Sequence, residues 1–102
     1  MTWRSAISLE LLRPDGVTGV EIEGVPVALY KLGERVYATH GICTHALAFL
    51  ADGFVEDGKI ECPLHQGLVD IRTGAPQCAP IVEAVRTYPV RINEGSVEIH
   101  VE

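Results

Sequence analysis

Residues 41–67 read GICTHALAFLADGFVEDGKIECPLHQG and are the most informative part of the chain. It holds two short motifs, Cys43-Thr44-His45 and Cys62-Pro63-Leu64-His65, with sixteen residues between them. Each motif pairs one thiol with one imidazole. Between the motifs, Asp57-Gly58 predicts a tight hairpin turn. We therefore expect the motifs at loop tips, where the backbone can fold back around a metal.

Turn signals continue along the rest of the chain, and the runs between them are rich in β-branched residues. The spacing predicts strands at residues 25–31, 35–39, 54–56, 59–61, 68–71, 85–92 and 96–101. No stretch keeps a helical period over about 12 residues, although residues 44–50 have room for a turn or two. The chain is expected to be all-β, an antiparallel β-sandwich or barrel in one domain.

Three kinds of site use paired thiols and imidazoles: a tetrahedral zinc site, a Rieske [2Fe–2S] cluster, and a Cys–His nucleophilic pair. Zinc fingers usually pair cysteine with cysteine and histidine with histidine along the chain, whereas each motif here holds one of each. That order favours a two-iron cluster, in which each loop gives its cysteine to one iron and its histidine to the other. A Cys–His nucleophilic pair would use only one of the two motifs and would leave the other unexplained.

The two motifs resemble the Rieske motif. From residue 41 onward the chain is similar to the Rieske ferredoxins of bacterial aromatic ring-hydroxylating dioxygenases, of the naphthalene-dioxygenase type. The resemblance is carried by ECPLHQG at 61–67, the Gly74 turn, CAP at 78–80 and TYPV at 87–90. The first 40 residues fit that family in length and strand content without a specific motif.

The resemblance implies a site in which Cys43 and Cys62 ligate one iron and His45 and His65 ligate the other. With two ferric irons, two sulfides, two thiolates and neutral imidazoles, the oxidised cluster is uncharged. Adding an electron to it is therefore easier than adding one to an all-cysteine cluster, and Rieske potentials span about −150 to +300 mV.

The family also implies a Rieske-type β-sandwich over the single domain 1–102, in which a cluster-binding subdomain of two loops, about 41–80, is inserted in a β base domain. A third loop, from residue 74 to residue 80, would cover the cluster. The residues expected around the ligands are Ala46, Gln66, Gly67 and Pro80. Gln66 and Gly67 are expected to be turn residues whose backbone N–H groups face cluster sulfur.

The sequence predicts a potential at the low end of the Rieske range. High-potential members carry an additional cysteine in each motif, and these form a disulfide; here the positions hold Ala48 and Leu64. Those members also place hydroxyl groups near the cluster sulfurs, where this chain has Gly67 and Val69. Hydroxyl donors stabilise the more negative reduced state, so their loss lowers the potential.

The resemblance implies an electron carrier between a flavoprotein NAD(P)H reductase and the terminal oxygenase, a Rieske non-haem iron protein. A chain of 102 residues has no room for the second iron domain of an oxygenase, so we expect no catalysis by the chain alone. Three alternatives stay open: a Rieske ferredoxin of a monooxygenase or another reductase system, a zinc-stabilised binding module, and a Cys–His hydrolase. The aromatic substrate is chosen by the oxygenase and is not encoded here.

Composition limits the partners and the compartment. A net charge of −6 disfavours nucleic acid and suits a protein partner with a basic surface. The sequence shows no membrane span and no signal peptide, so we expect a cytoplasmic protein, and a monomer suits a shuttle. Glu56, Asp57 and Glu61 are candidate docking acids.

Four residues outside the motifs have their own expectations. Cys78 lacks a paired histidine and is expected to be a small buried hydrophobic residue. His40 is expected in a loop, partly exposed, and His100 is expected to face solvent because it alternates with Val97 and Ile99. Trp3 is expected to pack on the base domain.

Overall fold

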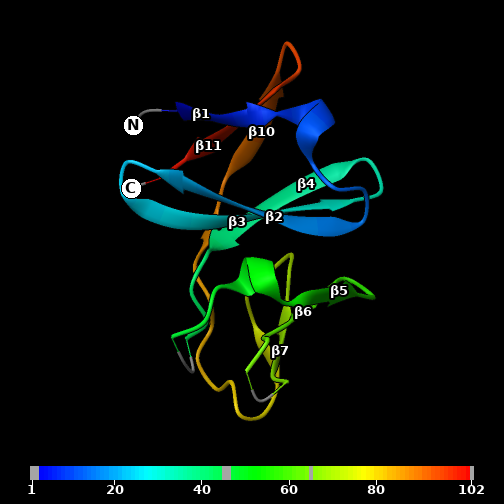
Figure 1. The fold of residues 1–102 in the computed structure, drawn as a ribbon, viewed down its shortest axis with the longest axis vertical. Coiled ribbons are helices and arrows are strands. Elements are labelled where there is room, and N and C mark those ends of the chain that lie inside the picture. The colour runs from blue at the N-terminus through cyan, green and yellow to red at the C-terminus, as the bar shows by residue number, and fades with distance from the viewer. Residues whose placement is uncertain (1–2, 45–46, 65, 102) are drawn as a thin grey trace.

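Three antiparallel sheets form the protein in the computed structural model, which describes residues 3–44, 47–64 and 66–101 (Figure 1). The sheet orders are β1-β11-β10, β2-β3-β4-β9 and β5-β6-β7-β8. The all-β prediction is confirmed. The strands are β1 (Trp3–Ser8), β2 (Gly16–Ile22), β3 (Val25–Leu32), β4 (Arg35–His40), β5 (Phe54–Glu56), β6 (Lys59–Glu61), β7 (Leu68–Asp70), β8 (Pro76–Cys78), β9 (Thr87–Tyr88), β10 (Val90–Asn93) and β11 (Ser96–His100), and two short 3₁₀ helices are η1 (Leu9–Leu11) and η2 (Leu50–Asp52).

The sheet β2-β3-β4-β9 lies between the other two and contributes to both hydrophobic cores. The base core joins it to the sheet of β1, β10 and β11 through Leu12, Ile22, Val27, Leu29, Ala38, Tyr88, Val97 and Ile99. The loop-side core joins it to the sheet of β5–β8 through Val17, Ala28, Tyr30, Cys43, Leu50, Ile60, Cys62, Val69, Ile71, Ile81 and Val85.

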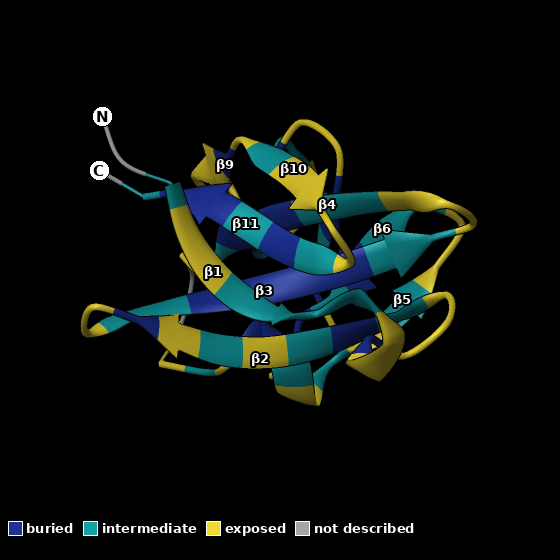
Figure 2. Ribbon diagram, turned by 90° about the horizontal axis from the view of Figure 1, so that it is seen from above, coloured by how far each residue is buried: buried dark blue, intermediate teal, exposed yellow. Residues whose placement is uncertain are grey.

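Strand β3 separates the two cores and contributes side chains to both. Its side chains alternate, so Val27 and Leu29 enter the base core while Ala28 and Tyr30 enter the loop-side core. This explains the unbroken apolar run at 27–30, which is typical of a strand buried on both faces. The strand is dark blue along this segment in Figure 2.

The hairpin between the two motifs forms as predicted. Strands β5 and β6 are antiparallel, with Phe54 opposite Glu61 at one end and Glu56 opposite Lys59 at the other. Asp57 and Gly58 both have positive φ, 53° and 75°, as a two-residue turn that follows strand twist requires. The hairpin belongs to the loop-side sheet and separates the two motif loops.

The predicted strand at 85–92 is divided in two. Proline at position 89 has no N–H group and interrupts the ladder. Strand β9 before it pairs with β4, whereas β10 after it pairs with β11 in another sheet. The chain therefore passes from the middle sheet to the outer sheet at Pro89.

His100 is buried, so the prediction that it faces solvent was wrong. Trp3 lies opposite His100 in the β1–β11 register and covers the imidazole edge-on, with ring centroids 5.6 Å apart. The Arg91 guanidinium lies over the Trp3 ring, 4.4 Å from its centroid. Trp3, 97 positions earlier in the chain, therefore buries a position of β11 that its alternating pattern marks as exposed. Trp3 itself packs on the base sheets, as expected.

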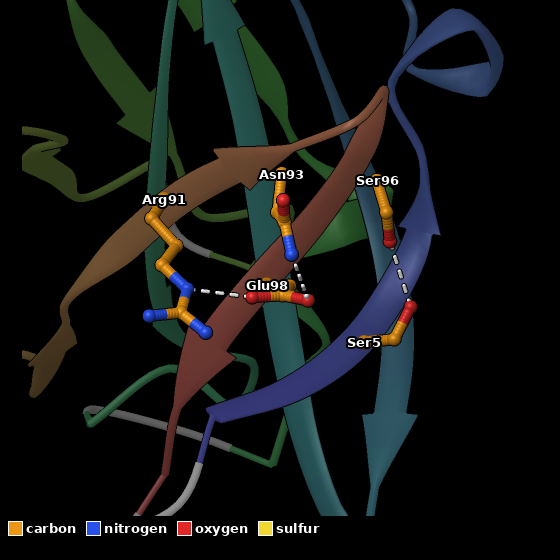
Figure 3. A network of polar contacts seen from close by, with 5 residues as sticks. All are labelled: Ser5, Arg91, Asn93, Ser96 and Glu98. Atoms are coloured by element: carbon orange, nitrogen blue, oxygen red, sulfur yellow. Dashed lines mark hydrogen bonds and ion pairs between the residues drawn. The ribbon is translucent and has the colours of Figure 1, made fainter.

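The outward face of the β1-β11-β10 sheet is polar (Figure 3). Arg91 Nε donates to Glu98 at 2.6 Å, and the Ser5 and Ser96 hydroxyls lie 2.8 Å apart. The Arg91 hydrogen bond lowers the pKa of Glu98 and outweighs the opposing effect of desolvation, and Asn93 contributes in the same direction as Arg91. In the described part of the chain, no helix is long and apolar enough to cross a membrane.

Candidate metal centre

Cys43 and Cys62 come together from two different loops. Cys43 follows β4, and Cys62 follows β6, yet both side chains are buried in the loop-side core. The two residues belong to the same hydrophobic core, neither forms a disulfide, and Cys43 is near enough to raise the pKa of the Cys62 thiol. The fold therefore brings the cysteines of the two motifs to one point.

The two loops are closed by equivalent backbone hydrogen bonds. The N–H of Cys43 donates to the carbonyl of Ala48 at 2.9 Å, and the N–H of Cys62 donates to the carbonyl of Gly67 at 2.8 Å. Each bond joins residue i to residue i+5, so each cysteine begins a six-residue loop. The predicted residues His45, Ala46 and His65 belong to these loops and lie outside the described residues.

The thiol pair fits a metal centre on its own chemistry. Burial raises the pKa of the Cys62 thiol, the Leu64 N–H lowers it, and the neighbouring Cys43 raises it. Two thiolates side by side in this core require positive charge to balance them. A thiolate-bound metal supplies that charge, and [2Fe–2S] and zinc centres both use this donor pair.

The first loop is hydrogen-bonded to the segment around Glu83, which is distant in sequence. The Thr44 hydroxyl donates to the carbonyl of Glu83 at 2.9 Å, across 39 residues. The N–H of Val85 in turn donates to the carbonyl of Gly74 at 2.8 Å. Sequence reasoning did not single out Thr44 for this role. Its position between Cys43 and His45 was the available signal, but nothing in the sequence identifies Glu83 as its partner.

The same segment packs on the second loop. A Cβ on Gly67 would lie 2.5 Å from Cγ1 of Ile81, so the absence of a side chain at 67 lets Ile81 approach closely. Gly67 is buried, whereas Gln66 is exposed and has a φ of 58°, which agrees with its predicted place in a turn. Pro80, half-buried, follows a cis peptide bond in the connection between β8 and Ile81.

Cys78 is exposed, and the prediction that it is buried was wrong. Strand β8 lies at the edge of its sheet and pairs with β7, so its side chains are covered less than those of an inner strand. Its thiol lies 3.9 Å from the carbonyl of Gln66. His40 is half-buried as expected, but it ends β4 rather than lying in a loop, and its Nδ1 is 3.4 Å from the Tyr88 hydroxyl.

The sequence matches a known protein family and several characterised relatives. The Rieske [2Fe-2S] domain matches residues 2–89. The anthranilate 1,2-dioxygenase ferredoxin subunit of Burkholderia cepacia is 58% identical over 76 residues, which are 74% of this chain and 70% of that protein. The naphthalene 1,2-dioxygenase system ferredoxin component of Pseudomonas aeruginosa is 44% identical over 97 residues, 95% of this chain and 93% of that protein.

Solved structures agree with the fold. The ferredoxin of carbazole 1,9a-dioxygenase from Nocardioides aromaticivorans IC177 superposes with a TM-score of 0.95 at 35% identity, covering 100% of both chains. A chain in a complex of reduced oxygenase and oxidized ferredoxin in carbazole 1,9a-dioxygenase matches with a TM-score of 0.90 at 30% identity. That match covers 98% of this chain and 97% of the other.

Proposed function

Because the chain belongs to the Rieske [2Fe–2S] family, we propose that it carries electrons from a flavoprotein NAD(P)H reductase to the terminal oxygenase of an aromatic ring-hydroxylating dioxygenase. Its close relatives are ferredoxin components, so it is an electron carrier and not a catalytic oxygenase. It holds one Rieske [2Fe–2S] cluster, which when bound takes up and releases one electron.

The observation that carries this proposal is the pair of buried cysteines that two equivalently closed loops place in one hydrophobic core. We assign Cys43 and Cys62 to one iron and His45 and His65, in the same loops, to the other. Ala46, Gln66, Gly67 and Pro80 are assigned to the surroundings of the cluster. The division of the single domain 1–102 into a base and a cluster-binding part at about 41–80 belongs to the same proposal.

The matched structure in which a ferredoxin is bound to its oxygenase supports an oxygenase as the electron acceptor. The resemblance supports the reductase as donor, and Ala48 and Leu64, at the positions of the bracing cysteine pair, support the low potential. The monomeric state, which suits a shuttle, and the cytoplasmic location are parts of the same proposal. A monooxygenase system is the alternative acceptor. Reduction of a dioxygenase component, compared with a monooxygenase component, by the prereduced chain distinguishes these two.

The ligand assignment is tested by EPR spectroscopy of dithionite-reduced protein, together with its iron and zinc content. We expect a rhombic Rieske signal and two irons per chain. Cys62→Ser should lose the signal, while the control Cys78→Ser should keep it, because Cys78 is exposed and outside the thiol pair. A colourless protein with one zinc would establish the binding-module alternative, and a Cys62→Ser protein with an unchanged spectrum would overturn the ligand set.

A further inference from the structure

We infer that a cavity between the middle sheet and the first loop binds a small carboxylic acid with a flat apolar body, the class to which benzoic acid belongs. The cavity, here called the junction cavity, is lined by β2, β3, β4 and β9, by Thr44 of the first loop, by residues 84–86 and by Val101. Its volume is about 660 Å³, which lies in the range of small-molecule sites. Binding there is a function beyond electron transfer.

Aliphatic side chains form much of the wall of the junction cavity. Ile22 and Val25 lie opposite each other where the turn joins β2 to β3, and Val85 and Val101 line the same space. Ile22 and Val85 are buried, whereas Val25 and Val101 are half-buried. Moving a flat apolar ring from water onto these side chains is favourable, so the wall accounts for the apolar body of the ligand.

Arg86 supplies a positive charge to the junction cavity. Its guanidinium lies over the Tyr88 ring, 5.1 Å from the centroid. Glu23 also lines the cavity, but its carboxylate forms an ion pair with Arg4. Within residues 3–44, 47–64 and 66–101, no acid forms an ion pair with Arg86. Its guanidinium can therefore donate two parallel hydrogen bonds to a carboxylate, which accounts for the acidic group of the ligand.

Hydrogen bonds fix the residues that carry the polar groups of the junction cavity. The N–H of His40 donates to the carbonyl of Arg86 at 2.8 Å, so the end of β4 holds the backbone at position 86. Nδ1 of His40 lies 3.4 Å from the Tyr88 hydroxyl, and Tyr88 is buried. Because these residues are ordered before a ligand arrives, binding costs less conformational entropy than it would in a mobile loop.

A second arginine, Arg72, provides the comparison. It lines one cavity together with three acids, Asp15, Glu56 and Asp57, whose charges oppose a carboxylate. It also lines another cavity that contains no acid but also lacks a histidine. The chain as a whole carries a net charge of −6, which disfavours general attraction of anions. Binding of a carboxylate therefore requires a local site, and Arg72 is the matched control for Arg86.

A ligand in the junction cavity also reaches the first loop. Thr44 lines the cavity, and its hydroxyl donates to the carbonyl of Glu83. A bound acid therefore adds contacts between the middle sheet and the loop that begins with Cys43, and these contacts should slow opening of that loop. This consequence rests on the proposed cluster, whereas binding itself rests on the cavity alone.

The experiment measures binding of benzoate, benzamide and acetate to the oxidised full-length protein by isothermal titration calorimetry at one ionic strength. Benzoate should bind with a Kd of about 1 mM or below. Benzamide lacks the charge and acetate lacks the ring, so each should bind at least about fivefold more weakly. Arg86→Gln should weaken benzoate binding about tenfold and remove its advantage over benzamide. Arg72→Gln should bind benzoate within about twofold of the parent protein.

Equal benzoate affinity of Arg86→Gln and the parent protein, or no binding by either, would overturn the site. A loss confined to Arg72→Gln would place the acid in another cavity and would overturn it equally. Saturating benzoate should slow the decay of cluster absorbance severalfold in the parent protein but not in Arg86→Gln, and an unchanged decay despite binding would overturn the link to the first loop. A chain that holds no cluster would overturn the proposed function, while the calorimetric comparison would still decide the cavity.

Discussion

Replacing Gly74 with alanine should destabilise the protein far more than the same change at Gly95. Both glycines have a left-handed backbone, with φ of 79° and 80°. An added Cβ costs about 1–2 kcal/mol at either position through backbone strain. At Gly95 it meets nothing within 4 Å, but at Gly74 it would lie 2.1 Å from the carbonyl oxygen of Val85. The pair therefore separates backbone strain from steric conflict.

The additional cost at Gly74 can be worked from its contacts. The Val85 carbonyl must move by roughly 1 Å to reach an acceptable separation, which disturbs the 2.8 Å hydrogen bond from Val85 N–H to the Gly74 carbonyl. Losing that bond costs about 1 kcal/mol, and loosening the buried Val85 side chain costs about 1 kcal/mol more. We expect an apparent Tm roughly 8–16 °C below that of Gly95→Ala, since 1 kcal/mol corresponds to about 4–8 °C in a domain of this size.

The measurement follows far-UV circular dichroism and cluster absorbance of the holoproteins at one heating rate, because cluster loss makes unfolding irreversible. Cluster absorbance of Gly74→Ala should fall early, since Val85 packs in the same core as Cys43 and Cys62. Equal Tm values for the two variants would refute the reasoning, because they would mean that the Val85 carbonyl moves aside without cost.

Three further predictions concern other contacts. Burial raises the pKa of Tyr30, and its hydrogen bond to Thr39 only partly offsets this; stability should therefore fall as the pH rises above about 10, the ordinary tyrosine value. Tyr30→Phe should flatten that alkaline fall in urea midpoints, at a cost of about 1 kcal/mol at pH 8, and an equally steep fall would contradict it. Arg91→Gln should raise the pKa of Glu98 toward its usual value, read from NMR titration of the carboxyl carbon, because the Arg91 hydrogen bond is the largest cause of its lowering; an unmoved titration would show that the pair is absent in solution. Gly67→Ala should speed cluster loss severalfold by pushing on Ile81, and the added change Ile81→Ala should restore much of the lifetime; no recovery would place the conflict elsewhere.

Turn chemistry made much of the fold predictable. Asp57-Gly58 and Glu94-Gly95 each adopt two consecutive positive φ values, so the hairpins that they close were readable from local sequence. The place of Cys43 and Cys62 in one core fits the hypothesis that both motifs serve one site, while the full ligand set stays a prediction. Local patterns also reported that Val97 and Ile99 are buried.

The errors arose where distant residues or sheet edges decide the outcome. His100 follows the pattern of an exposed position, but Trp3 covers it from the far end of the chain. Cysteine is among the residue types most often buried, but Cys78 lies on β8, which is an edge strand. The link from Thr44 to Glu83 spans 39 residues of sequence and has no local signal.

The double burial of β3 has a consequence for how the molecule comes apart. Ala28 and Tyr30 face the metal-bearing half, while their neighbours Val27 and Leu29 face the other half. Unfolding of either half would expose one face of β3 to water. The two halves therefore unfold as a single cooperative unit, although their strands belong to separate sheets. Stripping the iron should therefore be felt in amide exchange at β11, on the side of the molecule remote from the metal, and not only in the loops that held it.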